Sequence, residues 1–258
     1  MSFPNVKLSI EDRVAVLTID HAPANALNKD TFQGLIQALD TLEKDEQVKV
    51  IVITGEGRFF IAGADIKEFA EFSTDQAQAL SEAGQKVFDR MEAFPKPIIA
   101  AINGACLGGG LELAMACHIR LVATEAKLGL PELNLGLIPG YAGTQRLPRL
   151  IGRGMATKLT LTSEMISGEA AYQLGLAQGV YPVEQLLPEA KKLAHTIAQK
   201  SAVAIRLALE AIHAGIELGH KEGSQREAEL FGKAFSTEDQ KEGVAAFIEK
   251  RAPQFKDR

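Results

Sequence analysis

Two periods in the apolar positions predict where strands and helices lie along the chain. Continuous or alternating runs rich in β-branched residues predict strands over Val14–Ile19, Val48–Thr54 and Ile98–Ile102. Apolar residues three and four positions apart predict helices over Lys29–Glu46 and Thr74–Ala93. Because strands and helices alternate over the first two thirds of the chain, the pattern predicts an α/β core.

From Glu184 onward the apolar pattern becomes almost wholly helical. The expected helices are Leu187–Gln199, Ala202–Leu218, Glu222–Phe235 and Gln240–Lys250. No linker-like or low-complexity stretch separates this part from the rest, so the sequence predicts a single domain over 1–258, with an α/β core over about 1–183 and a helical tail over about 184–258. The tail carries more apolar residues than it can bury alone, which predicts contact with further copies of the chain; they include Leu207, Leu209, Ile212, Ile216 and Leu218.

Composition and charge narrow the class of protein. The chain has 258 residues, 46% of them hydrophobic and 24% charged, which is the balance of a globular protein rather than a disordered one. Lys and Arg number 28 against 33 Asp and Glu, so the net charge of -5 argues against a nucleic-acid partner. Cys106 and Cys117 match neither a disulfide framework nor a zinc site, and the first residues match no signal or transit peptide. We therefore expect a cytoplasmic protein without a metal.

One apolar stretch, Ile98 to Cys117, could be mistaken for a membrane span. It contains four glycines, and its strongly polar residues are Asn103 and Glu112. A carboxylate at the centre of a spanning helix costs about 2.5 to 3.5 kcal/mol on insertion scales. The sequence therefore predicts no membrane association, and it raises the question of why a carboxylate occupies this position.

Motif searches exclude several reaction classes. The sequence has no G-x-S-x-G elbow and no H-E-x-x-H helix, which argues against a serine or zinc hydrolase. The glycines at 104–109 are not followed by the Lys-Ser/Thr of a P-loop, and no strand leads into G-x-G-x-x-G. The chemistry is therefore expected to use side chains and backbone groups, without a nucleotide or redox cofactor.

Two glycine-containing segments each follow a predicted strand and precede a helix. The first is Phe59–Phe69 and the second is Asn103–Ala116. The first amides of a helix have no intrahelical acceptor and lie at the positive end of its dipole, so two such joints facing one another could bind an oxyanion. The alternative is that small residues at these joints only allow close packing of helix on strand.

Two glutamates lie in unusually apolar segments. Glu112 lies just inside the second joint, and Glu132 follows twenty residues later, after Pro131. Pro131 fits the first position of a helical turn, which would place Glu132 in that turn. A desolvated carboxylate can be poised for proton transfer, whereas a structural one normally needs a basic partner. The two glutamates are therefore a candidate catalytic pair.

Several motifs together resemble one family over essentially the full chain, the enoyl-CoA hydratases of the crotonase superfamily. They are Ala24-Asn-Ala-Leu-Asn28, Ala62-Gly-Ala-Asp-Ile-Lys-Glu68, Lys96 to Gly104, Gly108-Gly-Gly-Leu-Glu112, Pro131 to Pro139, Gly143-Thr-Gln-Arg-Leu147 and Phe235 to Phe247. The resemblance implies a superhelix of β-β-α turns followed by helices that mediate trimer formation, often with two trimers in a hexamer.

The resemblance also assigns site residues. It implies an oxyanion hole from the backbone N–H groups of Ala64 and Gly109, and catalytic carboxylates on Glu112 and Glu132. The segment around Ala64 and the loop before Leu27 are implied to bind the adenine and pantetheine parts of coenzyme A, through Ala24, Ala26, Ala62, Ala64, Asp65, Ile66, Lys67 and Gly109. Tyr141 and Ala142 depart from the small residues common in the family, which affects the expected acyl-chain preference.

The implied reaction is hydration of 2,3-unsaturated acyl-CoA thioesters to 3-hydroxyacyl-CoA, as in fatty acid β-oxidation, with coenzyme A as part of the substrate and no further cofactor. Glu132 is expected to protonate C2, while Glu112 holds and activates the water. The presence of both acids favours a hydratase over a related acyl-CoA enzyme such as a 3,2-enoyl-CoA isomerase. A non-catalytic RNA-binding relative is a further alternative, against which the charge of -5 and the acid pair argue.

Overall fold

Two β-sheets organise the chain, which we describe from a computed structural model covering residues 1–69 and 71–258, the side chains of Lys67 and Phe69 excepted. The larger sheet has the order β1-β2-β3-β4-β6-β8-β11 and the smaller one β10-β9-β7-β5. The larger sheet consists of β1 (Ser2–Phe3), β2 (Val6–Glu11), β3 (Val14–Ile19), β4 (Val50–Gly55), β6 (Ile98–Ile102), β8 (Ile119–Ala123) and β11 (Gly179–Tyr181). The smaller sheet consists of β5 (Phe59–Ile61), β7 (Ala105–Leu107), β9 (Lys127–Gly129) and β10 (Ile166–Ser167).

The central part of the chain repeats a β-β-α unit, with one strand in each sheet. Strands β4, β6 and β8 pair in parallel in the larger sheet, and β5, β7 and β9 pair in parallel in the smaller one. After each pair of strands come helices, namely α2 (Ile66–Phe69) and α3 (Thr74–Glu92), then α4 (Gly109–Ala116), then η1 (Glu132–Leu135), α5 (Gly143–Ile151) and α6 (Arg153–Thr162). The predicted α/β fold with its β-β-α superhelix is therefore confirmed. The segments that follow β5, β7 and β9 carry the candidate residues. Because these strands pair in parallel, the three segments leave the smaller sheet at the same edge.

Long elements lie close to where the apolar pattern predicts them. Strands β3 and β6 have the predicted bounds, and α1 (Lys29–Lys44) and α3 end within two residues of them. The segment Asn103–Ala116, expected to lead from the strand Ile98–Ile102 to a helix, also contains a strand that was not predicted, because β7 lies between β6 and α4. Three residues are too few to show a period, and this strand is defined instead by its pairing with β5 and β9 on either side.

The apolar stretch from Ile98 to Cys117 is divided among β6, β7 and α4. Every residue of α4 is buried, including its glutamate. Among the described residues, no helix is both long and apolar enough to cross a membrane. The unusual hydropathy of this stretch therefore reflects a helix packed inside the protein.

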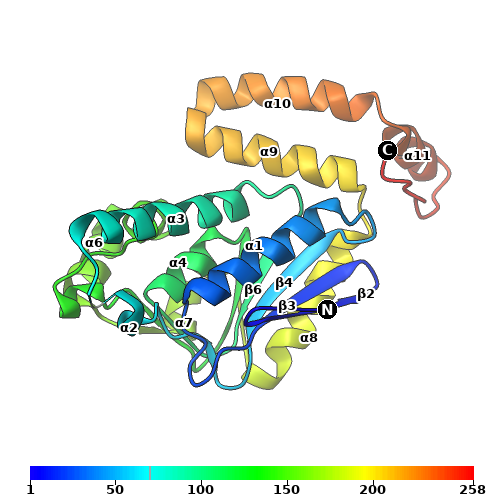
Figure 1. Ribbon diagram of the computed structural model, residues 1–258. Coiled ribbons are helices and arrows are strands. Elements are labelled where there is room, and N and C mark those ends of the chain that lie inside the picture. The colour runs from blue at the N-terminus through cyan, green and yellow to red at the C-terminus, as the bar shows by residue number, and fades with distance from the viewer. Residues whose placement is uncertain (70) are drawn as a thin grey trace.

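The helical end of the chain has two parts that pack differently. After α7 (Gly168–Gln173), helix α8 (Val183–Ala198) packs against β3, β4, β6 and β8 through a stripe of alanines one turn apart, Ala190, Ala194 and Ala198. It begins four residues before the predicted start at Leu187 because Pro188 is tolerated near its beginning. The remaining helices are α9 (Ala202–Leu218), α10 (His220–Phe235) and α11 (Glu238–Ile248). Figure 1 shows α9 and α10 as a hairpin that extends from the rest of the chain, with α11 and the C-terminus beyond it.

The hairpin and α11 carry many of the exposed apolar side chains. Of the residues expected to be unburied in the tail, Leu207 is in fact buried and Leu209 is half-buried, while the other three are exposed: Ile212, Ile216 and Leu218. Further exposed apolar side chains on α10 and α11 are Phe231, Phe235, Val244, Phe247 and Ile248. In one copy of the chain, this surface has no covering element among the described residues.

Candidate active site

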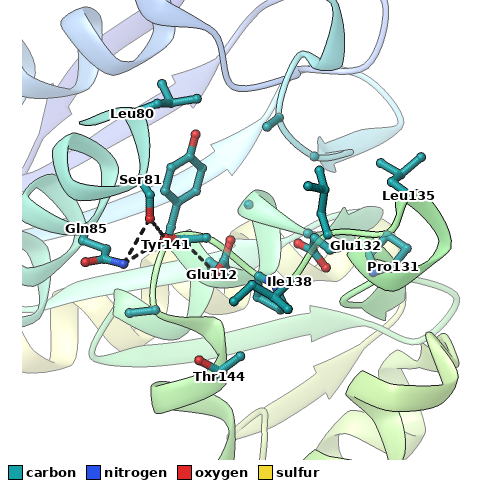
Figure 2. Close-up of a pocket in the computed structure, with 18 of the residues that line it drawn as sticks. Leu80, Ser81, Gln85, Glu112, Pro131, Glu132, Leu135, Ile138, Tyr141 and Thr144 are labelled. Carbon is teal, nitrogen blue, oxygen red and sulfur yellow. Dashed lines mark hydrogen bonds between the residues drawn. The ribbon is translucent and has the colours of Figure 1, made fainter. Parts of the chain in front are cut away.

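A cavity of about 530 Å³ lies where the turns of the β-β-α units meet. Its wall is formed by the segment after β5, the start of α4, one face of α3, and the chain between Pro131 and Gln145. Both sequence-predicted acids line it, and Figure 2 shows Glu112 and Glu132 reaching it from two different segments. The fold therefore brings together side chains that lie twenty residues apart in the sequence.

The two predicted joints lie next to each other at this cavity. Because β5 and β7 pair in parallel, the segments that follow them leave the small sheet side by side. A Cβ built on Gly108 would lie 3.9 Å from the Cα of Gly63 and 2.8 Å from Oε1 of Glu132. Gly108 also has a φ of +50°, a conformation that favours glycine. Glycine at this position allows both the turn into α4 and the approach of the Glu132 carboxylate.

Each joint carries a backbone N–H without a protein acceptor. The N–H of Leu27 donates to Gly63 O and the N–H of Asp65 donates to Leu27 O, both at 2.8 Å, so the groups on either side of Ala64 are paired. The N–H groups of Ala64 and Gly109 donate to no acceptor in the described part of the chain. Gly109 is the first residue of α4, where the ladder supplies no partner. Both residues line the cavity.

The loop before α1 packs against the first joint. The carbonyl of Ala24 accepts a bond of 3.1 Å from the N–H of Ala62. Of the residues that the resemblance assigns to coenzyme A binding, Ala62, Ala64, Ile66 and Gly109 line the cavity. Ala24, Ala26 and Asp65 lie nearby but are outside its described wall. The side chain of Lys67 lies outside the described part of the structure.

Asn25 shapes this loop, a role that was not predicted from the sequence. Its backbone is left-handed, with a φ of +56°, and its side chain is buried. The side-chain oxygen accepts from the N–H of His21, and the amide donates to Glu56 O and Phe59 O. Asparagine tolerates a left-handed backbone and bonds to its own loop, so an Asn between two alanines was the available signal.

Glu112 lies in α4 and is almost completely buried, with 1% of its surface exposed. Its Oε1 accepts the N–H of Tyr141 at 2.8 Å (Figure 2) and the N–H of Gly143 at 2.7 Å. Burial raises the pKa of Glu112 to about 7; the charge of Glu132 acts in the same direction, and the two N–H donors oppose it. No group in the described residues bonds to its other oxygen, Oε2, which leaves that oxygen to a ligand.

Glu132 begins the short 3-10 helix η1, with Pro131 at the cap position before it. The predicted helical turn is therefore present. Glu132 is half-buried, and its Oε2 is buried without a hydrogen-bond partner among the described atoms. Burial raises the pKa of Glu132 above its ordinary value. A buried oxygen without a partner is costly unless a ligand or water fills the site, so this carboxyl is suited to exchange a proton with something in the cavity.

Polar residues of α3 and α5 hold the loop that supplies donors to Glu112. Ser81 and Gln85 donate to the carbonyl of Gly140. The buried guanidinium of Arg146 donates to Tyr141 O and pairs with Asp89 and Glu92. None of these residues is among the site residues predicted from the sequence. The available signal was a series of polar positions three or four apart on α3: Ser81, Gln85, Asp89 and Glu92.

Within the described residues, no group of three or more His, Cys, Asp or Glu side chains could hold a metal ion. Cys106 and Cys117 are buried and unpaired. The polar groups that reach the cavity are therefore two carboxyls, backbone N–H groups, and neutral side chains such as Ser81, Gln85 and Thr144.

Comparison with known proteins places this arrangement in a class of acyl-CoA enzymes. The sequence pattern described as "Enoyl-CoA hydratase/isomerase" matches residues 9–258. A protein of Bacillus subtilis (strain 168) named "Probable enoyl-CoA hydratase" is 51% identical over 253 residues, covering 97% of this chain and 98% of that protein. The "Crotonyl-CoA hydratase" of Syntrophomonas wolfei is 45% identical over 257 residues, covering 99% of each.

A solved structure agrees with the sequence comparison. The crystal structure of an enoyl-CoA hydratase from Bacillus anthracis superposes with a TM-score of 0.95 at 38% identity, covering 98% of this chain and 100% of that one. The similarity thus extends over the β-β-α units and the helical end of the chain. The chain belongs to the enoyl-CoA hydratase/isomerase family.

Proposed function

We propose that this chain hydrates 2-enoyl-CoA thioesters to 3-hydroxyacyl-CoA, as in fatty acid β-oxidation. Relatives that carry the name enoyl-CoA hydratase or crotonyl-CoA hydratase match nearly the whole chain, which supports this activity. The observation that carries the proposal is the joint placement of two carboxyls and two unpaired N–H groups on one cavity. Addition of water to a conjugated thioester needs both kinds of group.

The N–H groups of Ala64 and Gly109 bind the thioester oxygen in this proposal. When water attacks C3, negative charge develops on that oxygen, and two fixed donors stabilise it where bulk water is excluded. A testable consequence is that replacing the Ala64 amide by an ester, through semisynthesis, removes one donor and lowers kcat by about 10² to 10³. An unchanged rate in the ester variant would place the oxyanion hole elsewhere.

The two carboxyls divide the proton transfers. Glu112 holds the attacking water and takes its proton, because its Oε1 is fixed by two N–H groups and its Oε2 faces no protein donor in the described residues. Glu132 delivers a proton to C2 in this proposal, since it lines the same cavity and its Oε2 has no hydrogen-bond partner in the described residues. Water thus supplies the hydroxyl at C3, and the proton added at C2 balances the one removed from water.

Coenzyme A is part of the substrate, and the proposed steps use no metal or redox cofactor. Its adenine and pantetheine parts lie against the joint after β5 and the loop that packs on it, from Ala24 to Ala26 and from Ala62 to Lys67. The bonds between Ala24 and Ala62 and between Leu27 and Gly63 support a single binding surface. Dialysis against a metal chelator is expected to leave the activity unchanged.

The experiment that tests this function follows the loss of absorbance of crotonyl-CoA, and then of longer 2-enoyl-CoA thioesters. Turnover that depends on enzyme concentration is expected. The family description also includes isomerases, so a 3-enoyl-CoA should be assayed in parallel. Conversion of the 3-enoyl substrate with no hydration of crotonyl-CoA would favour a 3,2-enoyl-CoA isomerase. A salt-dependent RNA shift without either activity would favour an RNA-binding relative.

We further propose that the chain assembles into a homotrimer or a homohexamer through its last helices. Exposed aromatic and aliphatic residues on α9, α10 and α11 support this, among them Ile216, Phe231, Phe235 and Phe247. Burying such a surface against other copies removes apolar area from water. Light scattering at micromolar concentration is expected to give three or six times the monomer mass, and a monomer would contradict the proposal.

We place the enzyme in the cytoplasm. The two buried, unpaired cysteines support a reducing compartment, since neither is cross-linked. Fractionation of cells that express the protein at its natural level tests this location. Recovery in the membrane fraction or outside the cell would contradict it.

A further inference from the structure

The peptide group between Gly140 and Tyr141 is bonded at both of its ends. Its carbonyl oxygen accepts from Ser81 Oγ at 2.5 Å and from Gln85 Nε2 at 2.9 Å. Its N–H donates to Glu112 Oε1 at 2.8 Å. Figure 2 draws this series of bonds from the α3 side chains to the glutamate. Because a peptide group is planar and rigid, fixing its oxygen also fixes the direction of its N–H.

We propose that Ser81 and Gln85 are positioning residues that hold Glu112 through the Gly140–Tyr141 peptide. The inference rests on the proposed hydratase function, in which Glu112 holds the attacking water. Two donors on the carbonyl polarise the peptide and strengthen the bond that its N–H makes to a carboxylate. Ser81 and Gln85 lie one turn apart on α3, so a single helix face supplies both donors.

Other contacts hold the surrounding loop when these two donors are removed. The Tyr141 ring packs edge-on against Phe32 and Phe88, with ring centroids 5.5 and 5.6 Å away. Arg146 donates to the Tyr141 carbonyl at 3.0 Å and is paired with two carboxylates of α3. Without the Ser81 and Gln85 donors, the Gly140–Tyr141 peptide can therefore rotate, while the Tyr141 ring and Arg146 still hold the loop in place.

The direction of the expected effect follows from the charges around Glu112. The Tyr141 and Gly143 N–H groups stabilise its ionised form, against burial. The charged groups that face it are Glu132, on η1, which raises its pKa, and Arg146, on α5, which lowers it. Substitutions at Ser81 and Gln85 change neither of these two charged groups. A weakened Tyr141 bond therefore moves the titration of Glu112 to higher pH.

The experiment compares Ser81→Ala, Gln85→Met and the double variant with the unchanged chain. Gln85→Met keeps the length of the side chain and removes its donor. Ser81→Thr restores a hydroxyl, and Gln78→Ala is the matched control, because Gln78 lies exposed on the same helix and bonds only within it. The readouts are kcat and KM for crotonyl-CoA, the acidic limb of the pH profile of kcat/KM, and the carboxyl resonance of Glu112 in protein labelled with ¹³C-glutamate.

In the double variant we expect the acidic limb and the Glu112 titration to move up by about half to one pH unit, as for the partial loss of one hydrogen bond to a carboxylate. The value of kcat at neutral pH should fall about three- to tenfold, with a smaller change in KM, since the segments proposed to bind coenzyme A are unaltered. Ser81→Thr should recover most of the loss, and Gln78→Ala should match the unchanged chain.

A folded double variant whose Glu112 titrates as in the unchanged chain would overturn the proposal, even if kcat falls. The same holds if only KM changes. If the unchanged chain fails to hydrate any enoyl-CoA, the proposed function fails, but the ¹³C titration still decides whether the α3 side chains act on Glu112. Circular dichroism and the thermal midpoint verify folding, and the single variants serve if the double variant does not fold.

Discussion

The two sides of the cavity hold their carboxyls in different ways. Glu112 lies within α4, 1% exposed, with two backbone donors on one oxygen. Glu132 lies on the short helix η1, half-buried, with one oxygen that has no partner in the described structure. The turn that carries Glu132 continues into exposed apolar residues, Leu135, Leu137 and Ile138, whereas the loop facing Glu112 is fixed by α3 and by Arg146.

This difference indicates how the two roles are separated. A carboxylate that holds and orients a water molecule benefits from a fixed position, because misplacement lowers the rate of attack. A carboxyl that delivers a proton to a substrate carbon needs an unoccupied oxygen that faces the ligand. Each carboxyl has one oxygen without a hydrogen-bond partner in the described residues, but only Glu112 is held by two backbone N–H groups. The proposed roles therefore give the more firmly held carboxyl to the water and the other to C2.

The largest expected effect comes from removing either acid. Glu112→Gln and Glu132→Gln should each retain coenzyme A binding but lose hydration of crotonyl-CoA by several orders of magnitude. If the two act as one unit, the double variant should lose much less than the product of the single losses. Glu125→Gln, at an exposed position, is the control. Unchanged turnover in either single variant would remove that residue from the mechanism.

A smaller expected effect is on the pH dependence of the free energy of unfolding, which should differ between the two acids because Glu112 is more deeply buried than Glu132. The folded pKa of Glu112, about 7, lies above its ordinary value of 4.5, so the fold favours its neutral form. The stability contributed by that form is complete below about pH 4.5 and is lost as pH rises through 7. Glu112→Gln should therefore gain stability over the unchanged chain with rising pH, on the order of 3 kcal/mol by pH 8.

Urea unfolding at pH 5 and pH 8 measures this gain. Glu132→Gln should show a smaller pH-dependent difference, because its carboxyl is only half-buried. Equal pH dependence of stability in the two variants would contradict the claim that the greater burial of Glu112 distinguishes it from Glu132. The exposed variant Glu125→Gln again provides the baseline.

The smallest expected effect tests how tightly the Glu112 side is packed. A Cβ on Gly84 would lie 2.3 Å from the Tyr141 ring, which is confined by Phe32 and Phe88. Gly84→Ala should therefore lower the free energy of unfolding by about 1 to 3 kcal/mol through overpacking, and reduce kcat by displacing the Tyr141 N–H. Chemical denaturation and the crotonyl-CoA assay measure the two effects.

A second helical glycine provides the control for this change. Gly154 lies in α6, and a Cβ there would meet no atom within 4 Å. Gly154→Ala should be neutral or slightly stabilising, because alanine has the higher helix propensity. If Gly84→Ala behaves in the same way, the loop that faces Glu112 is more adaptable than we infer.

The parts of the fold that could be predicted from the sequence are those with a period long enough to detect. Strands β3 and β6 and helix α9 have the predicted bounds, since each packs an apolar run against the core or a neighbouring helix. Strands β5 and β7 could not be predicted, because three residues carry no period and their pairing depends on segments over forty residues apart.

The site residues likewise differ in whether they could be predicted from the sequence. Glu112 and Glu132 were visible because a carboxylate in an apolar segment is unusual, and the motifs reinforced them. Asn25, Ser81 and Gln85 were not identified, since a polar residue on a helix or loop is ordinary until its partner is known. The carbonyl of Gly140 has no sequence signal, because every residue supplies a backbone carbonyl and only the fold decides its partners. The N–H of Ala64 was indicated by the joint and the motif that contain it, but its lack of a partner in the described residues appears only in the fold.

The most direct test of the central claim follows the atoms of the added water. Crotonyl-CoA should be converted by the enzyme in water enriched in both deuterium and oxygen-18, and the product analysed by mass spectrometry and NMR. If two glutamates and an oxyanion hole add water in this cavity, the 3-hydroxybutyryl-CoA product should carry one oxygen-18 at C3 and one deuterium at C2. In Glu112→Gln and Glu132→Gln, both labels should appear in the product much more slowly. Deuterium incorporation without oxygen-18, or labelling that persists at the same rate in the two variants, would contradict the account.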